Sequence, residues 1–138
     1  VDLHPPRELP KDYVKAAEEV MSSLKIRKYD KKTGKYTFDI TTSKIRSFLS
    51  IANDIYIVEN SRKEDTLHEE SIHKLNMLRI RLLYEAGRFE KEVKPFIEES
   101  QLISYIKGIG TSRKKFIEFF RYLEALVAYH RYLGESKL

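Results

Sequence analysis

The sequence predicts an all-α fold, a single-domain bundle of about five helices with a basic loop or short hairpin between helices one and two. Two observations support this. Apolar residues recur at three- and four-residue spacing along most of the chain, and glycines and prolines fall mainly between the periodic segments. At 138 residues the chain can form one hydrophobic core but is too short to expect two. We therefore expect an extended N-terminal arm at 1–9, one helical domain at 10–134 and a C-terminal tail at 135–138.

The first two expected helices flank the loop. The first begins at Pro10, a favourable first-turn residue, and runs to about residue 26. Residues 29–40 break the helical period, and the turn sequence Asp30–Gly34 indicates a short hairpin or an ordered loop. Thr41 or Thr42 then caps a second helix. Its inward positions are Ile45, Phe48, Leu49, Ala52, Ile55 and Tyr56.

The last two expected helices are separated by glycines. One runs from about Pro95 to Gly108, and the next begins after Thr111 or Ser112 and continues to Gly134. This final helix is apolar over about half its circumference, which predicts that it is the central helix of the bundle. Its apolar positions are Phe116, Phe119, Phe120, Leu123, Leu126, Val127 and His130.

The third expected helix, at 72–89, has two different faces. One face is apolar, at Ile72, Leu75, Leu82, Leu83 and Ala86. The other combines cationic, aromatic and thioether side chains, at Lys74, Met77, Arg81, Tyr84 and Arg88. Cationic and aromatic side chains in such a row can bind a phosphate backbone. Met77 and Tyr84 could equally pack against a neighbouring subunit. Arg79 lies within the apolar face, so we expect it to pair with a buried carboxylate or reach the surface.

Composition limits the possible functions. The chain has 26 Lys and Arg, 21 Asp and Glu, and no cysteine, so an acidic partner is permitted and a thiolate metal site is excluded. It has no run long enough to cross a membrane, and we expect a cytoplasmic protein with no membrane partner. His68 and His73 are five apart, the wrong spacing for a zinc-protease motif. We find no catalytic constellation and expect a protein that is not an enzyme, with no metal and no cofactor.

One short motif and two further basic groups remain. Lys107-Gly108-Ile109-Gly110 followed by a helix resembles the turn of helix–hairpin–helix DNA-binding motifs, although Lys114 stands where a small residue is usual. A second basic group lies in the loop, at Lys25, Arg27, Lys28, Lys31, Lys32 and Lys35, interleaved with Tyr29 and Tyr36. A third is Lys114, Arg121 and Tyr132 on the last helix. Outward lysines and arginines are usually just solvated.

Three segments together resemble one known family, the small helical subunit of type III-A CRISPR–Cas (Csm) interference complexes. The first is Thr41-Thr-Ser-Lys-Ile-Arg46 leading into FLSIANDIY. The second is LRIRLLYEAGR at 78–88, and the third is FRYLEALVAYH at 120–130, closing at Gly134. The resemblance covers about two thirds of the chain, residues 41–134.

The resemblance implies a non-catalytic role in antiviral defence. The chain would stack with other copies of itself beside the backbone subunits, contact the large subunit, and touch the duplex of guide RNA and target RNA. The basic residues inside the matched motifs are the implied RNA contacts, namely Lys44, Arg46, Arg79, Arg81, Arg88 and Arg121. They would touch phosphates and riboses without reading sequence. Two alternatives stay open, a stand-alone nucleic-acid-binding module that uses the glycine turn and a purely structural spacer subunit.

Overall fold

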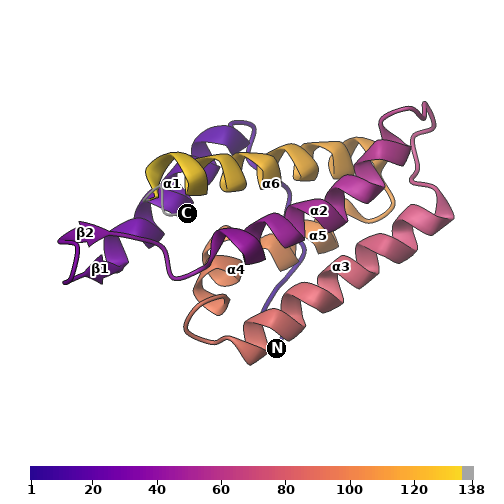
Figure 1. Cartoon of the computed structure of the whole chain (residues 1–138). Helices are drawn as coiled ribbons and strands as arrows, with labels where there is room; N and C mark the ends of the chain where they lie inside the picture. Colours follow the sequence, from indigo (N-terminus) through magenta and orange to yellow (C-terminus); the bar gives the residue numbers. More distant parts are fainter. Residues whose placement is uncertain (135–138) are drawn as a thin grey trace.

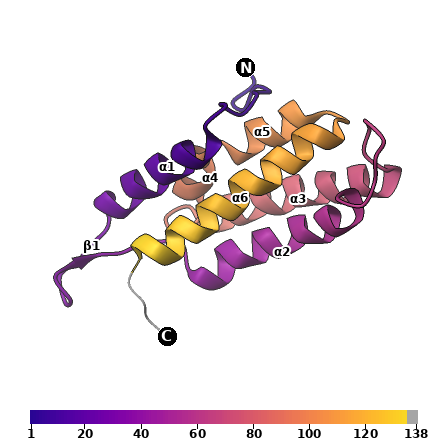
Figure 2. The ribbon, with the colours of Figure 1, turned by 90° about the horizontal axis from the view of Figure 1, so that it is seen from above.

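Six helices and one small hairpin make up a computed structural model, which describes residues 1–134 (Figure 1). The final helix, α6, lies between α1 and α2 and also packs on α5, while α3 packs on α2, α4 and α5 (Figure 2). The elements are α1 (Tyr13–Arg27), β1 (Tyr29–Asp30), β2 (Lys35–Tyr36), α2 (Thr42–Glu59), α3 (Glu69–Arg88), α4 (Lys94–Ser100), α5 (Leu102–Ile109) and α6 (Arg113–Leu133). The all-α prediction is confirmed, with six helices in place of about five.

The helix starts follow from side-chain caps. Asp12, Thr41 and Ser112 each accept a hydrogen bond from the backbone N–H three residues later, which satisfies one free donor of the first turn. Thr41 therefore caps α2 and Ser112 caps α6, each one of the two residues that the sequence offered for that cap. The first helix starts at Tyr13 rather than Pro10, because the cap is Asp12.

The predicted helix from Pro95 to Gly108 is two helices, and this correction adds the sixth helix. Gln101 separates α4 from α5 with φ 56° and ψ 32°, a left-handed conformation that ends one helix and begins the next. The buried Tyr122 hydroxyl donates to the Ser100 carbonyl at 2.8 Å, so a carbonyl left free by the break is satisfied inside the core.

The core lies around α6, whose broad apolar face is buried as predicted. Its fully or nearly fully buried residues are Phe116, Phe119, Phe120, Tyr122, Leu123 and Leu126. Six buried side chains within eleven positions cannot lie on a narrow face, which is why α1, α2 and α5 can all pack against this one helix. Val127 is only partly buried. The prediction of a central final helix is confirmed.

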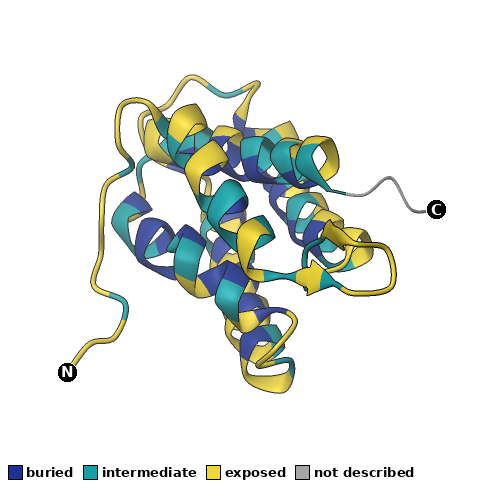
Figure 3. Cartoon of the chain, turned by 90° about the vertical axis from the view of Figure 1, so that its left-hand side faces the viewer, coloured by how far each residue is buried: buried dark blue, intermediate teal, exposed yellow. Residues whose placement is uncertain are grey.

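The N-terminal arm is extended and lies against α4, α5 and α6. The Arg7 N–H donates to the Ser104 carbonyl at 3.0 Å, and Leu9 packs against the core. Two acidic side chains of the arm form ion pairs with lysines of the helices. Asp2 pairs with Lys107 of α5 at 3.0 Å, and Glu8 pairs with Lys115 of α6 at 2.9 Å. Exposed residues dominate both this arm and the hairpin, as the burial colouring shows (Figure 3). The predicted tail at 135–138 lies outside the described residues.

Candidate nucleic-acid interface

Helix α3 has one buried face, although its residues differ in part from those predicted. The buried residues are Ser71, Leu75, Leu78, Leu82 and Ala86. Leu83, predicted to face inward, is 45% exposed, whereas Leu78, not predicted, is fully buried. One residue advances a helix by about 100°, so Leu82 and Leu83 cannot both point to the core. The sequence places both inward because, when two adjacent residues are apolar, helical periodicity alone does not show which of them lies at the middle of the buried face.

The outer side of α3 carries an exposed apolar row. Its members are Met77, Ile80, Leu83 and Tyr84, each between 45% and 64% exposed. About two turns of one helix therefore present apolar and aromatic groups to solvent, which is unusual for a face with no partner. The predicted outward positions of Met77, Arg81, Tyr84 and Arg88 are confirmed, and Lys74 is partly buried.

The best defined cluster of candidate residues lies where α2 begins and α3 ends. The Lys44 ammonium lies 3.7 Å from the centre of the Phe89 ring and 3.2 Å from a Glu85 carboxylate oxygen. The Arg88 guanidinium carbon lies 5.2 Å from the centre of the same ring, and Arg88 also donates to the Tyr84 hydroxyl at 3.3 Å. Phe89 thus holds two cations near each other.

Arg81 lies two helical turns before Arg88 on the same side of α3, since seven residues are close to two full turns. Its side chain is exposed, and it forms no ion pair with any residue in 1–134. We call Lys44, Arg81 and Arg88 the α2–α3 basic face. Of these three, Arg81 has the side chain most available to a phosphate.

The other candidates lie elsewhere. Arg79 is two residues from Arg81, about 200° around the helix, and therefore points to the opposite side. It is partly buried and has no ion pair within the described chain, so of the two expected outcomes the pairing with a buried carboxylate is not found, and the side chain is partly exposed at the surface. Arg46 is likewise two residues from Lys44, faces away from α3 and is exposed. The six candidates do not converge on one surface.

Arg121 lies on α6 and contacts α2. Its guanidinium donates to the Tyr56 hydroxyl at 2.6 Å and to Glu124 at 2.8 Å. The contact with Glu124, together with the phenol and carboxylate charges nearby, raises the pKa of this already permanently charged group. Arg121 is therefore held between two helices by intramolecular partners, which compete with any phosphate for its donors.

The one fully buried acidic side chain in residues 1–134 has a structural role. Glu59, at the end of α2, accepts from Arg62 at 2.7 Å and from the His68 N–H at 3.0 Å. Burial raises the pKa of Glu59, but hydrogen bonds from Ser71, Arg62 and His68 outweigh that effect and hold the pKa below its usual value. The sequence analysis missed this residue, although Glu59 continues the buried spacing of Ala52 and Ile55 along α2, because an acidic side chain at the end of a helix is usually solvated.

The glycine turn before α6 is not open to a phosphate. A Cβ added at Gly108 would lie 1.9 Å from the Arg7 carbonyl oxygen, so the arm covers this glycine. The Arg113 N–H at the start of α6 already donates to the Asp65 carbonyl at 2.9 Å. The first glycine of the turn is therefore covered and one N–H at the helix start is already bonded, whereas Gly110 is exposed. This arrangement weakens the resemblance to a helix–hairpin–helix turn.

The histidines do not form a metal site. The His68 ring nitrogen Nδ1 accepts from the Glu70 N–H at 3.1 Å and caps α3. Buried His130 donates from Nε2 to the Ile40 carbonyl at 2.9 Å and stacks on Phe38. No group of three His, Asp or Glu side chains within residues 1–134 could hold a metal ion.

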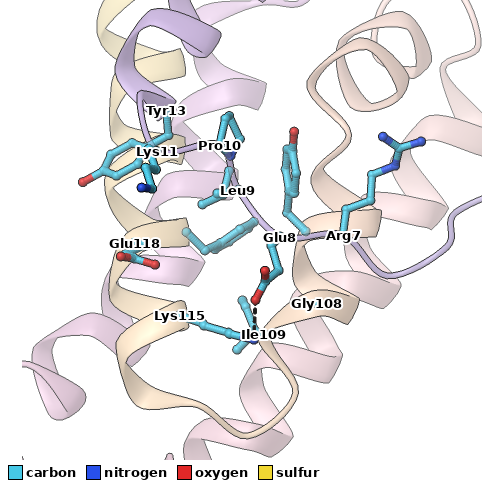
Figure 4. Close-up of a pocket in the computed structure, with 12 residues that line it drawn as sticks. Arg7, Glu8, Leu9, Pro10, Lys11, Tyr13, Gly108, Ile109, Lys115 and Glu118 are labelled. Carbon is cyan, nitrogen blue, oxygen red and sulfur yellow. Dashed lines mark ion pairs between the residues drawn. The ribbon is translucent and has the colours of Figure 1, made fainter.

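A hollow of about 200 Å³ lies between the arm and helices α5 and α6 (Figure 4). The Glu8–Lys115 ion pair spans it, and Leu9 and Phe119 contribute apolar walls. Tyr13 and Tyr105 also line it, and its lining contains no histidine, serine or threonine. Within residues 1–134 every helix is too short or too polar to cross a lipid bilayer.

The fold and surface define a class of protein: a small, all-helical domain with a basic face at a helix junction and exposed apolar residues beside it. A family model described as Csm2 Type III-A matches residues 13–136. The chain belongs to this family and is a small subunit of a type III-A CRISPR Csm complex.

Three relatives support this assignment, each described as "CRISPR system Cms protein Csm2". The protein from Mycobacterium tuberculosis is 37% identical over 122 residues, which is 88% of this chain and 91% of the relative. The Streptococcus thermophilus protein is 37% identical over 123 residues, covering 89% and 92%. The Enterococcus italicus protein is 33% identical over 95 residues, or 67% of each chain.

Proposed function

We propose that this subunit contacts the guide–target RNA duplex through the α2–α3 basic face. One observation carries the proposal: Lys44 and Arg88 both lie against the Phe89 ring, and unpaired, exposed Arg81 lies two turns before Arg88 on α3. Three cations on one side of two adjacent helices suit the regular spacing of phosphates along an RNA strand. Contacts would go to phosphates and riboses, and base pairing with the guide would supply specificity.

The wider role follows the family. The chain would work in the cytoplasm, without catalysis, beside backbone and large subunits and other copies of itself. Residues 10–134 would act as one small-subunit domain with the arm at 1–9 fastened to it. Arg46, Arg79 and Arg121 stay candidates for RNA contact, but each lies outside the α2–α3 basic face.

The test is the double variant Arg81→Gln and Arg88→Gln in the assembled complex. We expect weaker capture of target RNA and a smaller slope of log affinity against log salt, by about 1.4 if two phosphate contacts are lost. The matched control is Lys11→Gln with Lys15→Gln, which removes the same charge from exposed positions outside α2 and α3. Equal losses in both double variants, or no loss at any salt concentration, would contradict the assignment.

A second candidate function is that of a purely structural spacer, and the exposed row of Met77, Ile80, Leu83 and Tyr84 favours it. In that case α3 would meet a protein subunit. Ile80→Ser with Leu83→Ser would then prevent assembly, and the Arg81 and Arg88 variant would lower the yield of complex without changing the RNA affinity of the complex that forms. Normal assembly of the serine variant excludes this function.

A further inference from the structure

We propose that the β1–β2 hairpin is a second RNA-contacting element, which binds an unpaired stretch of RNA through lysines and stacked tyrosines. This contact goes beyond the proposed function and does not depend on the α2–α3 basic face. The hairpin extends away from the helical body in two perpendicular views (Figures 1 and 2). It is therefore free to reach a ligand that does not touch the helices.

The first argument is charge. Residues 25–36 contain six basic residues and one acidic residue, an excess of five. The formal net charge of the whole chain is also +5, so the rest of the sequence is balanced and this segment holds the entire positive excess. A local excess of this size attracts a polyanion, whereas dispersed surface charges do not.

The second argument is the availability of the lysines. Lys28 pairs with Asp39 at 3.1 Å, and Arg27 pairs with Glu99, so these two residues fix the base of the hairpin. Lys31 and Lys32 lie in the exposed turn, and neither side chain has an ion-pair partner within residues 1–134. Two adjacent free ammonium groups at the tip are available for phosphates.

The third argument is the aromatic pair. Tyr29 and Tyr36 face each other across the strands with ring centres 5.2 Å apart at 63°. The pair stabilises the hairpin, yet Tyr29 is 52% exposed and Tyr36 46% exposed, so ring surface stays open to solvent. Exposed aromatic rings between cations form a stacking platform for unpaired bases, and duplex RNA, whose bases are already stacked, cannot use it.

The turn is ordered, so the platform exists before RNA binds. Asp30 accepts from the Lys32 N–H at 2.9 Å through its side chain and from the Gly34 N–H at 2.8 Å through its carbonyl. Gly34 has φ 71°, which a glycine adopts without strain. Preorganisation of this kind lowers the entropy cost of binding.

The experiment measures binding of the full chain to a single-stranded uridine oligomer of about 20 nucleotides and to an RNA duplex of the same length, at low salt. We expect Tyr29→Leu with Tyr36→Leu to weaken single-strand binding at least about fivefold and to leave duplex binding unchanged. Tyr29→Phe with Tyr36→Phe keeps both rings and should bind like the wild type. Ultraviolet crosslinking to uridine should map to Tyr29 or Tyr36.

A second double variant, Lys31→Gln with Lys32→Gln, tests the lysines. It should reduce the slope of log affinity against log salt by about 1.4, because two phosphate contacts are lost. Lys11→Gln with Lys15→Gln again removes equal charge and should change little. The proposal is overturned if the leucine variant binds the single strand normally, if the control loses as much as the hairpin variant, or if the wild type does not bind. Equally tight binding of polyglutamate would also overturn it and would indicate an acidic protein partner.

The two proposals fail independently. The Arg81→Gln and Arg88→Gln variant keeps the hairpin intact, so it should lose duplex capture in the assembled complex and still bind the uridine oligomer as an isolated chain.

Discussion

The backbone of Arg7 crosses directly over Gly108, so close that a Cβ at position 108 would lie 1.9 Å from the Arg7 carbonyl oxygen. The arm and α5 therefore touch through backbone atoms, and the Arg7 N–H reaches the Ser104 carbonyl at 3.0 Å in the preceding turn. Gly108 permits this approach because it has no side chain.

Gly108→Ala should lower the free energy of unfolding by about 1–3 kcal/mol, because the clash is with backbone and outweighs the better helix propensity of alanine. Thermal unfolding measures the loss, and limited proteolysis should show faster cleavage in the arm. The control is Gly87→Ala in α3, where an added Cβ meets nothing within 4 Å. That variant should be neutral or stabilised by up to about 1 kcal/mol, and equal effects at the two glycines would contradict the interpretation.

Stability should fall as the pH drops below about 6.5. Burial lowers the pKa of His130 below its ordinary value, although the hydrogen bond to the Ile40 carbonyl opposes the shift. His130 therefore takes up its proton at a higher pH in the unfolded chain than in the folded chain. As the pH falls below the unfolded-state pKa, the free energy of unfolding decreases by at most about 1.4 kcal/mol per pH unit.

Denaturant unfolding between pH 8 and pH 5.5 tests this with His130→Gln and, as control, exposed His73→Gln. The pH dependence should flatten in the His130 variant and persist in the control. An identical pH slope in the wild type and the His130 variant would exclude His130 as the cause.

Glu59→Gln should cost about 2–3 kcal/mol of stability, since it replaces a buried, hydrogen-bonded carboxylate with a neutral amide and removes the closer of the two carboxylates that contact Arg62. The folded-state pKa of Glu59 is lowered, so its contribution is present above the unfolded-state pKa and is lost as the pH falls through the folded-state pKa. The wild type should therefore lose more stability in acid than the variant does.

Glu64→Gln is the matched control for this variant, because Glu64 contacts the same Arg62 guanidinium at 3.6 Å from an exposed position. Chemical denaturation should place it close to the wild type. If the two glutamine variants are equally destabilised, burial is not the reason for the effect at Glu59.

Gln101→Gly should stabilise the protein by roughly 0.5–1 kcal/mol, because the φ of 56° costs a non-glycine residue about 1–2 kcal/mol and the greater freedom of glycine in the unfolded chain offsets part of that gain. A β-branched side chain fits this conformation worse, so Gln101→Val should destabilise. Melting temperatures of the two variants should move in opposite directions. A fall in stability with glycine would show that the Gln101 side chain contributes more than its backbone strain costs.

The sequence determined which segments are helical and where α2 and α6 begin. It placed the starts of α1 and α3 three residues away from where they lie. Caps such as Thr41 and Ser112, and the broad apolar face around Phe119 and Phe120, are local features that do not need a tertiary structure to act. The six RNA-contact candidates also came from the sequence, through motif resemblance, and their contact with RNA stays a prediction.

The tertiary structure decided what local patterns leave open. It broke one predicted helix at Gln101, buried Leu78 and exposed Leu83, and put Arg79 on the opposite side of α3 from Arg81. It also brought Lys44 and Arg88 to one aromatic ring across 44 residues of chain. Helical periodicity sets the order of residues around each helix, but only packing between helices selects which side meets the core and which cations meet each other.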